Sequence, residues 1–406
     1  MNDEKNENLN KCLVAMSGGV DSSVAAYLMK EKGYSPIGVT MMLHDQDLSC
    51  TAGTHLCCTP DDIEDARLVC SALGVPFYVV NFMDGFREKI IDKFIETYLR
   101  GETPNPCIDC NRYMKFGRLF EMADEKECSK VVTGHYARVE YDESAGIYKL
   151  KRAVDQTKDQ TYVLYFLSQD QLARLCFPLG EYEKEKARVI AEEQGIITAR
   201  KHDSQDICFV PDGDYAGFME REAAERVRVA LEAAAKLGDG ANSKSGDGTD
   251  DAADYSANGM FVDIDGNIIG PHKGYYHYTI GQRRGLGVAA GDRIYVVDII
   301  PEKNQVVLGS NEDLFTRKVE AKDFNLISMP DKEAIIEGDD ASNRDEIKLK
   351  VTAKVRYRAK DTSGILTLGP DGKASMMFDE PVRAVTPGQS LVVYDGEYCL
   401  GGGVIV

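Results

Sequence analysis

One stretch near the N-terminus decides the fold: Val14-Ala15-Met16-Ser17-Gly18-Gly19-Val20-Asp21-Ser22-Ser23. An apolar run breaks there into small residues, and a helical pattern follows until about Gly33, which predicts a strand, a loop and a helix. Gly18 and Gly19 lack a Cβ, so the backbone can turn tightly and approach a ligand closely. The N–H groups at the helix start and the serine hydroxyls then face an anion of phosphate size. No lysine follows the glycines, so the loop is not of the Gly-x-x-x-x-Gly-Lys-Ser/Thr type.

Length and composition limit the class of protein. The 406 residues suffice for two or three domains, and 43% hydrophobic residues suffice for ordinary packed cores. The polar start, Met1–Asn8, is no signal peptide, and no apolar run is long enough to span a bilayer. We therefore expect a cytoplasmic protein without a membrane partner, whose 11 cysteines serve packing, catalysis or metal binding. The net charge of −19 argues against a generally basic nucleic-acid binder but not against a local basic face.

Strands and helices alternate over residues 11–150. Beyond the opening stretch, we expect strands at 35–42, 77–80 and 130–133 and helices at 59–74 and 84–99. This rhythm is typical of a parallel sheet covered by helices, in which ligands bind at the carboxyl ends of the strands. The opening loop, Met41 and Gly134-His135 should meet at that edge. Residues 161–195 are expected to be helical.

The chain changes character twice beyond this part. An Ala-rich segment leads into a flexible acidic insert at about 238–256, and Asp265-Gly266 marks a turn in a small β-rich segment. Beyond 292, short alternating strands indicate an antiparallel barrel. The predicted fold class is α/β: a parallel-sheet domain at 1–212, a small central domain at 213–292 and a C-terminal antiparallel β-barrel at 293–406.

Three cysteines stand in contexts that suit chemistry. Cys107 and Cys110 lie three residues apart on a loop-like, proline-rich segment, and Cys208 lies in a polar turn. Arg112 and Lys115 follow Cys110, and nearby cations activate a thiolate. Five other cysteines fit apolar or helical patterns and are expected in the core: Cys12, Cys70, Cys128, Cys176 and Cys399.

Three interpretations of these residues stay open. Cys110 and Cys208 form a catalytic pair in the first, one carrying sulfur as a persulfide and the other attacking or resolving. In the second, Cys107, Cys110 and Cys208 ligate a metal ion or an iron–sulfur cluster with one open position. In the third, all three are buried core cysteines.

Several motifs together resemble those of the tRNA-specific 2-thiouridylases, the MnmA family. They are Ser17 to Ser23, Thr103-Pro104-Asn105-Pro106 with Cys110-Asn111, Lys115-Phe116, Thr133 to Arg138, Lys158 to Tyr162, Asp203-Ser204 with Ile207-Cys208-Phe209, Tyr278 to Arg283, and Pro381 to Gln389. The first of them also resembles the PP-loop of ATP pyrophosphatases, which cleave ATP between the α and β phosphates. The match runs nearly end to end, interrupted mainly by the acidic insert.

The resemblance implies an ATP-dependent enzyme, with Mg²⁺ accompanying ATP, that converts the wobble uridine of tRNAs for Lys, Glu and Gln to 2-thiouridine. It also implies a partner that donates sulfur, such as a cysteine desulfurase or a sulfur relay protein. The implied ATP ligands are Ala15, Met16, Ser17, Gly18, Gly19, Val20, Asp21, Ser22, Met41 and Gly134. Asn105, Pro106 and Cys107 would face the target base, and tRNA would meet His135, Lys158, Asp159, Gln160, Arg356, Tyr357 and Gln389. Cys110 matches the nucleophile of the family and Cys208 its persulfide carrier.

One position departs from the family pattern. Many members have Asp where this chain has Cys107, and that Asp is a proposed acid or base. Either Asp109 or a water molecule takes over this role, or Cys107 joins Cys110 and Cys208 as a ligand of a [4Fe–4S] cluster.

The expected chemistry has two stages. Adenylation makes the 2-oxo group of uridine a good leaving group, and a persulfide on Cys208 then supplies sulfur. Its outer sulfur attacks directly, or leaves as sulfide when Cys110 forms a disulfide with Cys208. The base must be unstacked to enter the pocket, and basic strips such as Lys354 to Arg358 would hold phosphates. Two other hypotheses are a different ATP pyrophosphatase, which would not need these cysteines, and a non-enzymatic RNA- or metal-binding scaffold.

Overall fold

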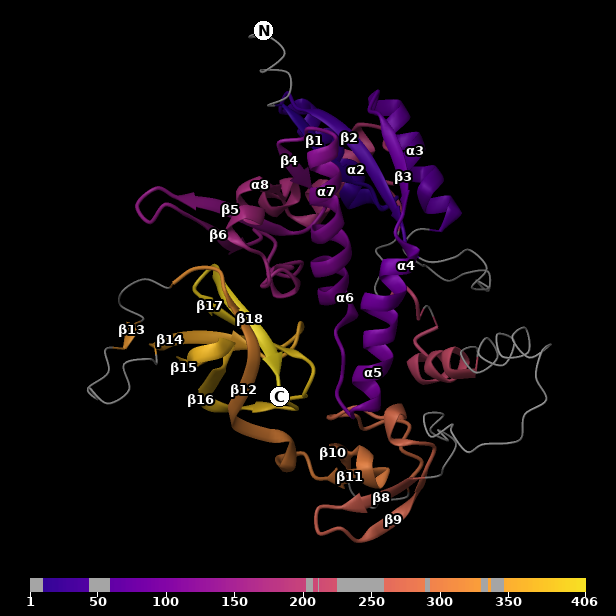
Figure 1. Ribbon diagram of the computed structural model, residues 1–406, viewed down its shortest axis with the longest axis vertical. Helices are drawn as coiled ribbons and strands as arrows, with labels where there is room; N and C mark the ends of the chain where they lie inside the picture. Colours follow the sequence, from indigo (N-terminus) through magenta and orange to yellow (C-terminus); the bar gives the residue numbers. More distant parts are fainter. Residues whose placement is uncertain are drawn as a thin grey trace, which may run out of the picture.

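The computed structural model describes residues 10–43, 59–201, 207–210, 212–224, 259–288, 293–329, 335–336 and 347–406 (Figure 1). The acidic insert predicted at about 238–256 and the motif Asp203-Ser204 lie outside these ranges. None of the helices within them combines the length and apolar character that crossing a membrane requires.

The N-terminal part is built on a parallel sheet, as predicted. Its strands are β1 (Lys11–Ala15), β2 (Ser35–Met42), β3 (Phe77–Asn81), β4 (Lys130–Val132) and β7 (Leu175–Cys176). They take the order β3-β2-β1-β4-β7, and every pairing between them is parallel. The carboxyl ends of β1, β2 and β4 therefore share one edge, where the opening loop, Met41 and Gly134 were expected.

Both faces of this sheet are covered, because side chains alternate along each strand. Cys12 and Val14 pack in a cluster with α2 (Val20–Glu31), α3 (Pro60–Leu73) and α9 (Lys184–Glu193). Leu13, between them, packs in a second cluster with α5 (Lys93–Leu99) and α7 (Leu119–Glu125). The burial predicted for five cysteines is confirmed: Cys12, Cys70, Cys128 and Cys399 are buried, and Cys176 is half-buried.

Helix α3 begins and ends where the sequence predicts. The Thr59 hydroxyl accepts a hydrogen bond from the Asp62 N–H (3.1 Å), and the Asp62 carboxylate accepts one from the Thr59 N–H (2.9 Å). This reciprocal capping box satisfies two donors that the first turn leaves without helical partners. Gly74 ends the helix in the left-handed region, at φ 66°.

Other helical predictions need correction. The helix expected at 84–99 is present as α4 (Met83–Phe86), the π-helical η1 (Arg87–Asp92) and α5. The segment around Cys107 and Cys110, expected to be a loop, instead begins a long helix made of α6 (Pro106–Asp109), the π-helical η2 (Cys110–Arg118) and α7. Proline is favoured at the first position of a helix, where its missing N–H costs nothing, and Pro106 occupies that position.

Residues 161–195 are less helical than predicted. They contain η3 (Thr161–Val163), α8 (Gln169–Arg174), η4 (Pro178–Glu181) and α9, with strand β7 between α8 and η4. Leu175 and Cys176 extend the parallel sheet because they pair with Val131 and Val132 of β4. This pairing depends on a distant strand, so the local apolar pattern did not reveal it.

A second, smaller sheet follows in the chain. It contains β8 (Gly259–Asp263), β9 (Ile268–His272), β10 (Tyr295–Ile300) and β11 (Gln305–Gly309), in the order β10-β11-β8-β9. The predicted boundary at 292/293 cuts through this sheet and is corrected to a point after Gly309. The physical reason is burial, because Val296, Val306 and Leu308 complete a core around Phe261.

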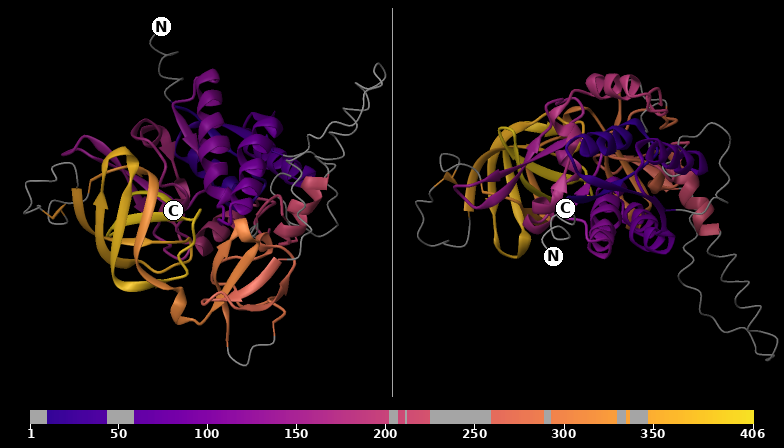
Figure 2. Two further views of the ribbon diagram at one scale, coloured as in Figure 1. Left: turned by 60° about the horizontal axis from the view of Figure 1, so that its bottom comes forward. Right: turned by 90° about the horizontal axis from the view of Figure 1, so that it is seen from above.

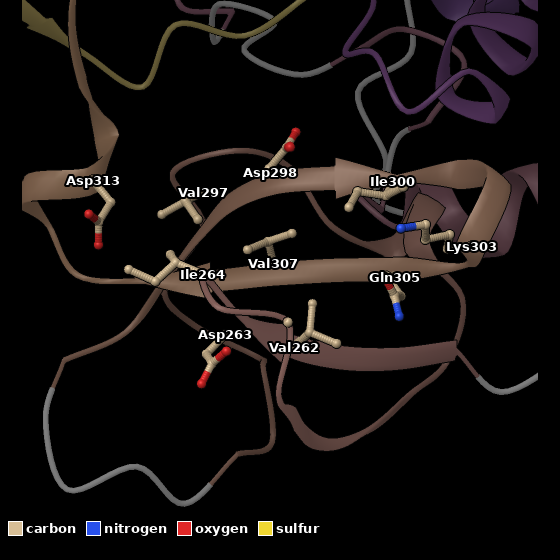
Figure 3. A pocket seen from close by; sticks show the side chains of 11 residues that line it. Val262, Asp263, Ile264, Val297, Asp298, Ile300, Lys303, Gln305, Val307 and Asp313 are labelled. Atoms are coloured by element: carbon tan, nitrogen blue, oxygen red, sulfur yellow. The ribbon is translucent and has the colours of Figure 1, made fainter.

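The opposite face of the small sheet holds a pocket of about 410 Å³ (Figure 3). Its apolar lining includes Val262, Val297 and Val307, and Asp263 and Asp298 also line it. None of the predicted site residues contributes to this pocket, so it is separate from the candidate site.

The C-terminal part is a closed antiparallel β-barrel, as predicted. Its strands are β12 (Phe315–Leu326), β14 (Ile347–Lys354), β15 (Thr362–Leu368), β16 (Ala374–Arg383), β17 (Ser390–Asp395) and β18 (Tyr398–Ile405). They follow the order β12-β16-β15-β14-β17-β18, and β12 also pairs with β18, which closes the ring; the short β13 (Ile335–Ile336) pairs with β14.

The N-terminal part contacts both smaller bodies. A hairpin of that part, β5 (Ala137–Asp142) and β6 (Ile147–Arg152), adds to β18 and so joins the parallel sheet domain to the barrel. Figure 2 shows the barrel, in yellow, and the small sheet, in orange, as separate bodies that lie side by side against the N-terminal part. The N-terminal part and the barrel are therefore joined by continuous strand pairing.

Candidate active site

The loop between β1 and α2 is shaped to receive an anion. Gly18 adopts φ 70°, and a Cβ there would lie 2.2 Å from the Asp62 carbonyl oxygen, so only glycine fits. The Ser22 hydroxyl accepts a hydrogen bond from the Ser17 N–H (3.1 Å) and donates one to the Gly19 carbonyl (3.1 Å), which fixes the turn. Gly19 occupies the N-cap of α2, and no side chain caps this end of the helix. The positive end of the helix therefore faces outward from the sheet edge.

Asp21, in the first turn of α2, is held by two residues from elsewhere in the chain. The Lys184 Nζ lies 2.8 Å from both Asp21 carboxylate oxygens, and the Tyr136 hydroxyl donates to Oδ1 (3.0 Å). Lys184 is buried on α9, so its charge compensates the carboxylate in a place where water screens it weakly. Sequence reasoning missed Lys184, because a lysine on a helical segment carries no motif signal.

The predicted ATP-binding residues of other strands lie beside this loop. Gly134 follows β4, and a Cβ there would lie 2.9 Å from backbone atoms of Asp21 and Ser22, so Gly134 packs directly on the first turn of α2. Met41 is buried near the end of β2. The neighbouring Thr40 hydroxyl donates to the Met16 carbonyl (2.7 Å) and so ties β2 to the loop. The structure thus gathers the whole predicted set at one edge.

The cysteine-bearing helix runs toward this edge. Asn105 is its N-cap and accepts a hydrogen bond from the Ile108 N–H (3.4 Å). Cys107 is exposed in the first turn, and Cys110 is half-buried one turn later. Further along, the Phe116 ring lies 5.8 Å from the ring of His135, the residue after Gly134. The helix that begins with the two thiols therefore reaches the side of the loop at Phe116.

Cys208 lies in the turn before Phe209, whose ring packs against Phe86 and Phe94. Cys208 is half-buried, and Cys110 and Cys208 both pack against the same hydrophobic cluster. The described residues contain no group of three His, Cys, Asp or Glu side chains placed to hold a metal ion. The cluster interpretation of Cys107, Cys110 and Cys208 therefore stays a prediction, and we derive no step through a cluster.

Asp109 lies between the two cysteines of the helix and carries an unusual electrostatic environment. Burial raises the pKa of its carboxyl, although Lys93 and Arg112 act in the opposite direction. The Lys93 Nζ lies 2.6 Å from Asp109 Oδ1. A carboxyl with a raised pKa is a candidate for the acid or base role that Cys107 cannot perform.

His135 and Asp159 are buried rather than presented to a partner. The His135 Nδ1 forms a hydrogen bond with the Thr133 hydroxyl (2.7 Å), and burial, reinforced by Lys115, lowers the pKa of the ring well below its usual value. The ring is therefore neutral near pH 7. Asp159 accepts hydrogen bonds from the Ala153 N–H (3.1 Å) and the Thr161 hydroxyl (2.7 Å). Neither side chain is placed for direct contact with tRNA in this conformation.

Lys158 and Gln160, the residues that flank Asp159, lie in different environments. Lys158 is half-buried, and Gln160 Oε1 accepts a hydrogen bond from the Tyr136 N–H (2.9 Å), which supports the tyrosine that holds Asp21. This part of the predicted tRNA set therefore reaches the nucleotide loop through Tyr136.

The barrel reaches the cysteine helix through two predicted tRNA contacts. The Tyr357 hydroxyl donates to the Asp159 carbonyl (3.2 Å). Burial raises the pKa of Tyr357, and the charges of Asp159 and Cys107 add to this effect, so the phenol lies within electrostatic range of the Cys107 thiol. Tyr357 keeps 38% of its surface exposed, and Arg356 beside it is exposed. The Gln389 amide donates to the carbonyls of Thr103 and Pro104, both at 3.1 Å, just before the cysteine helix.

Comparison with known proteins agrees with this architecture. Three family models match: tRNA methyl transferase HUP domain at residues 10–212, tRNA methyl transferase PRC-barrel domain at 253–310, and Aminomethyltransferase beta-barrel domain at 318–405. The second range ends at residue 310, directly after β11, which is the last strand of the central sheet.

Relatives that match over nearly their whole length give the same result. The chain is 45% identical to the tRNA-specific 2-thiouridylase MnmA of Clostridioides difficile, over 97% of this chain and 98% of that protein. It is 44% identical to the tRNA-specific 2-thiouridylase MnmA 2 of Caldanaerobacter subterraneus subsp. tengcongensis, over 98% of each chain. These matches confirm the family predicted from the motifs: the chain belongs to the tRNA-specific 2-thiouridylases, the MnmA family of tRNA sulfurtransferases with an ATP-using PP-loop domain.

Proposed function

We propose that this protein uses ATP and sulfur to convert the wobble uridine of tRNAs for Lys, Glu and Gln to 2-thiouridine, releasing AMP and pyrophosphate. The observation that carries the proposal is the connection between the anion-binding loop and the cysteine helix through Gly134, His135 and Phe116. A nucleotide on the loop and a base beside the thiols would then share one pocket. A different ATP pyrophosphatase would not need the thiols of Cys110 and Cys208.

The loop between β1 and α2 would hold the phosphates during adenylation. Its ligands would be the N–H groups at the start of α2 and the hydroxyls of Ser17 and Ser22, with Met41 and Gly134 shaping the adenosine side. Both Asp21 oxygens contact Lys184, so Asp21 does not fit the role of a Mg²⁺ ligand in this arrangement, and we route no step through that ion. The Lys184 charge keeps Asp21 from repelling the phosphates.

The target base would enter between the barrel and the cysteine helix. Asn105, Pro106 and Cys107 form the start of that helix, and Tyr357, which is partly exposed, lies within electrostatic range of the Cys107 thiol. Specific RNA recognition favours unpaired bases that stack on aromatic side chains. Tyr357 would therefore support the unstacked uridine, while Arg356 contacts a phosphate.

Sulfur would arrive as a persulfide on Cys208, formed by a sulfur-donating protein such as a cysteine desulfurase. The outer sulfur attacks C2 of the adenylated uridine, the C2–O bond breaks, and AMP leaves with the electron pair. The Cys110 thiolate then attacks the Cys208 sulfur and forms a Cys110–Cys208 disulfide, which leaves the sulfur on C2. A thiol reductant restores both cysteines for the next cycle. Asp109 would accept the proton of the Cys110 thiol before this attack, which generates the thiolate.

Mass spectrometry of tRNA nucleosides tests the proposal. The protein is incubated with unmodified tRNA, ATP, free cysteine and a purified cysteine desulfurase. The proposal requires 2-thiouridine that depends on ATP, together with pyrophosphate release that depends on tRNA. ATP cleavage without tRNA and without 2-thiouridine would instead indicate another ATP pyrophosphatase.

A further inference from the structure

The linker from Leu99 to Pro104, which joins α5 to the cysteine helix, is held at its first end by the central part of the chain. The Tyr275 hydroxyl donates to the Leu99 carbonyl (2.7 Å). Gly101 adopts φ 74°, and a Cβ there would lie 2.6 Å from Pro301 Cγ, so the linker backbone packs closely on the central sheet. These contacts fix where the linker leaves α5.

The barrel holds the second end of the same linker. The Thr103 N–H donates to the Pro387 carbonyl (2.8 Å), and the Gln389 amide donates to the carbonyls of Thr103 and Pro104. Gly388 adopts φ 86°, and a Cβ there would lie 2.8 Å from the Thr103 carbonyl oxygen. The barrel loop from Pro387 to Gln389 therefore packs directly against the linker. Its Gln389 amide supplies a donor to the carbonyls of Thr103 and Pro104, which have no helical partner.

Gln389 is itself firmly placed. Its carbonyl accepts from the Ile405 N–H (2.8 Å), and the preceding Gly388 N–H donates to the Ile405 carbonyl (3.0 Å). The residue is thus anchored to the end of β18, and its half-buried side chain extends from there to the linker.

The chain between Pro104, which Gln389 holds, and the thiols of Cys107 and Cys110 is short and rigid. Asn105 and Pro106 are the residues between Pro104 and Cys107. Asn105 caps the helix, and the ring of Pro106 fixes its φ, so a displacement of Pro104 moves the first turn with it. Cys110 lies one turn further along the same helix.

We propose that Gln389 is a positioning residue: from the barrel, it holds Thr103 and Pro104 so that Cys107 and Cys110 face the reacting base. This role differs from the direct tRNA contact that the family resemblance implies for Gln389. It rests on the proposed function, because Cys110 matters to the reaction as the thiolate that attacks the Cys208 sulfur and releases the thiolated base.

The test compares Gln389→Met with the parent protein. Methionine keeps the length of the side chain and its neutrality but removes the amide donor. Gln305→Met, the same change on β11 of the central sheet, is the matched control. Gln389→Glu, which keeps the shape and loses the donor, is the second variant if the methionine protein does not fold.

Two measurements give the outcome. Without ATP or tRNA, the rate at which iodoacetamide alkylates Cys110, read by fragment mass spectrometry, should rise several-fold in Gln389→Met because the helix start loosens. In turnover, kcat should fall by about 10- to 100-fold, the cost of a misplaced reacting group, while the KM and Kd for tRNA stay unchanged. The control should match the parent protein in both.

An unchanged alkylation rate with a weaker Kd for tRNA would show that Gln389 is a tRNA contact and overturn the proposal. Unchanged values throughout would also overturn it. The alkylation rate can be measured without turnover, so it tests the positioning role even if the parent protein makes no 2-thiouridine. Absence of 2-thiouridine with the parent protein would contradict the proposed function and not the positioning role.

Discussion

The Lys184 ammonium lies 2.8 Å from both carboxylate oxygens of Asp21, although 163 residues separate them in sequence. The pair connects α9 to the first turn of α2, the helix that follows the loop proposed to hold the phosphates. The pair explains how the Asp21 carboxylate can lie beside an anion-binding loop without repelling an anion, because the charges of Asp21 and Lys184 largely cancel there.

Lys184→Met should therefore weaken ATP binding and destabilise the fold. The variant leaves Asp21 with an uncompensated charge near the phosphates. Breaking a fully buried pair costs about 3–5 kcal/mol, and we expect about 2–3 kcal/mol because part of Asp21 is exposed to water. Urea denaturation measures the loss, and the KM for ATP in pyrophosphate release should rise. Lys186→Met, an exposed position on the same helix, is the control and should change neither.

Gly18→Ala should be more damaging than a glycine replacement with a similar backbone angle elsewhere. Gly33 has φ 81°, and nothing lies within 4 Å of the point where its Cβ would stand, whereas a Cβ on Gly18 would meet the Asp62 backbone. Gly33→Ala should cost about 1–2 kcal/mol from the left-handed backbone alone. Gly18→Ala adds the steric clash, so it should cost more and should also reduce ATP-dependent pyrophosphate release. Equal losses in both variants would mean that the loop does not pack on α3 as the structure shows.

His135 should make the folded state sensitive to acid. Burial lowers the pKa of its ring in the folded protein, so the unfolded chain binds the proton first as pH falls below the ordinary value of 6.5. The stability that neutral His135 contributes is therefore present above that value. It is lost as pH falls, at up to about 1.4 kcal/mol per pH unit. Urea titrations from pH 7 to 5 should show a shallower loss for His135→Gln than for the parent protein. Parallel curves would show that His135 is not buried as a neutral ring.

Cys107→Ser should keep most of the thiolation activity. The proposed persulfide route uses the thiols of Cys110 and Cys208, so it does not need the thiol of Cys107, which is exposed. Anaerobically purified parent protein and variant are compared for iron content, absorbance near roughly 400 nm and 2-thiouridine formation. Loss of activity in Cys107→Ser together with loss of bound iron would favour a [4Fe–4S] cluster on Cys107, Cys110 and Cys208.

Features determined by nearby residues were predictable from the sequence. The capping of α3 by Thr59 and Asp62, its end at Gly74 and the strand–loop–helix order around Gly18 all arise within a few residues. The alternation of strands and helices then placed Met41 and Gly134 at the loop, since carboxyl ends of parallel strands share one edge. The motifs added the family, which the comparisons confirm.

Features that depend on distant pairing were not predictable in this way. Lys184 meets Asp21, Gln389 meets Thr103, and β6 adds to β18 only after the chain has folded. The boundary at 292/293 failed for the same reason, because the apolar pattern of β10 suits either neighbouring sheet. The loop expected around Cys107 is a helix because Asn105 and Pro106 together form a helix start, a signal that the two prolines of the segment obscured.

The most direct test of the account is nucleoside mass spectrometry on tRNA incubated with ATP, cysteine, a cysteine desulfurase and either the parent protein, Cys110→Ser or Cys208→Ser. The account predicts 2-thiouridine at the wobble position with the parent protein alone, while both variants still release pyrophosphate when tRNA is present. Formation of 2-thiouridine by Cys110→Ser or Cys208→Ser at the parent rate would contradict it.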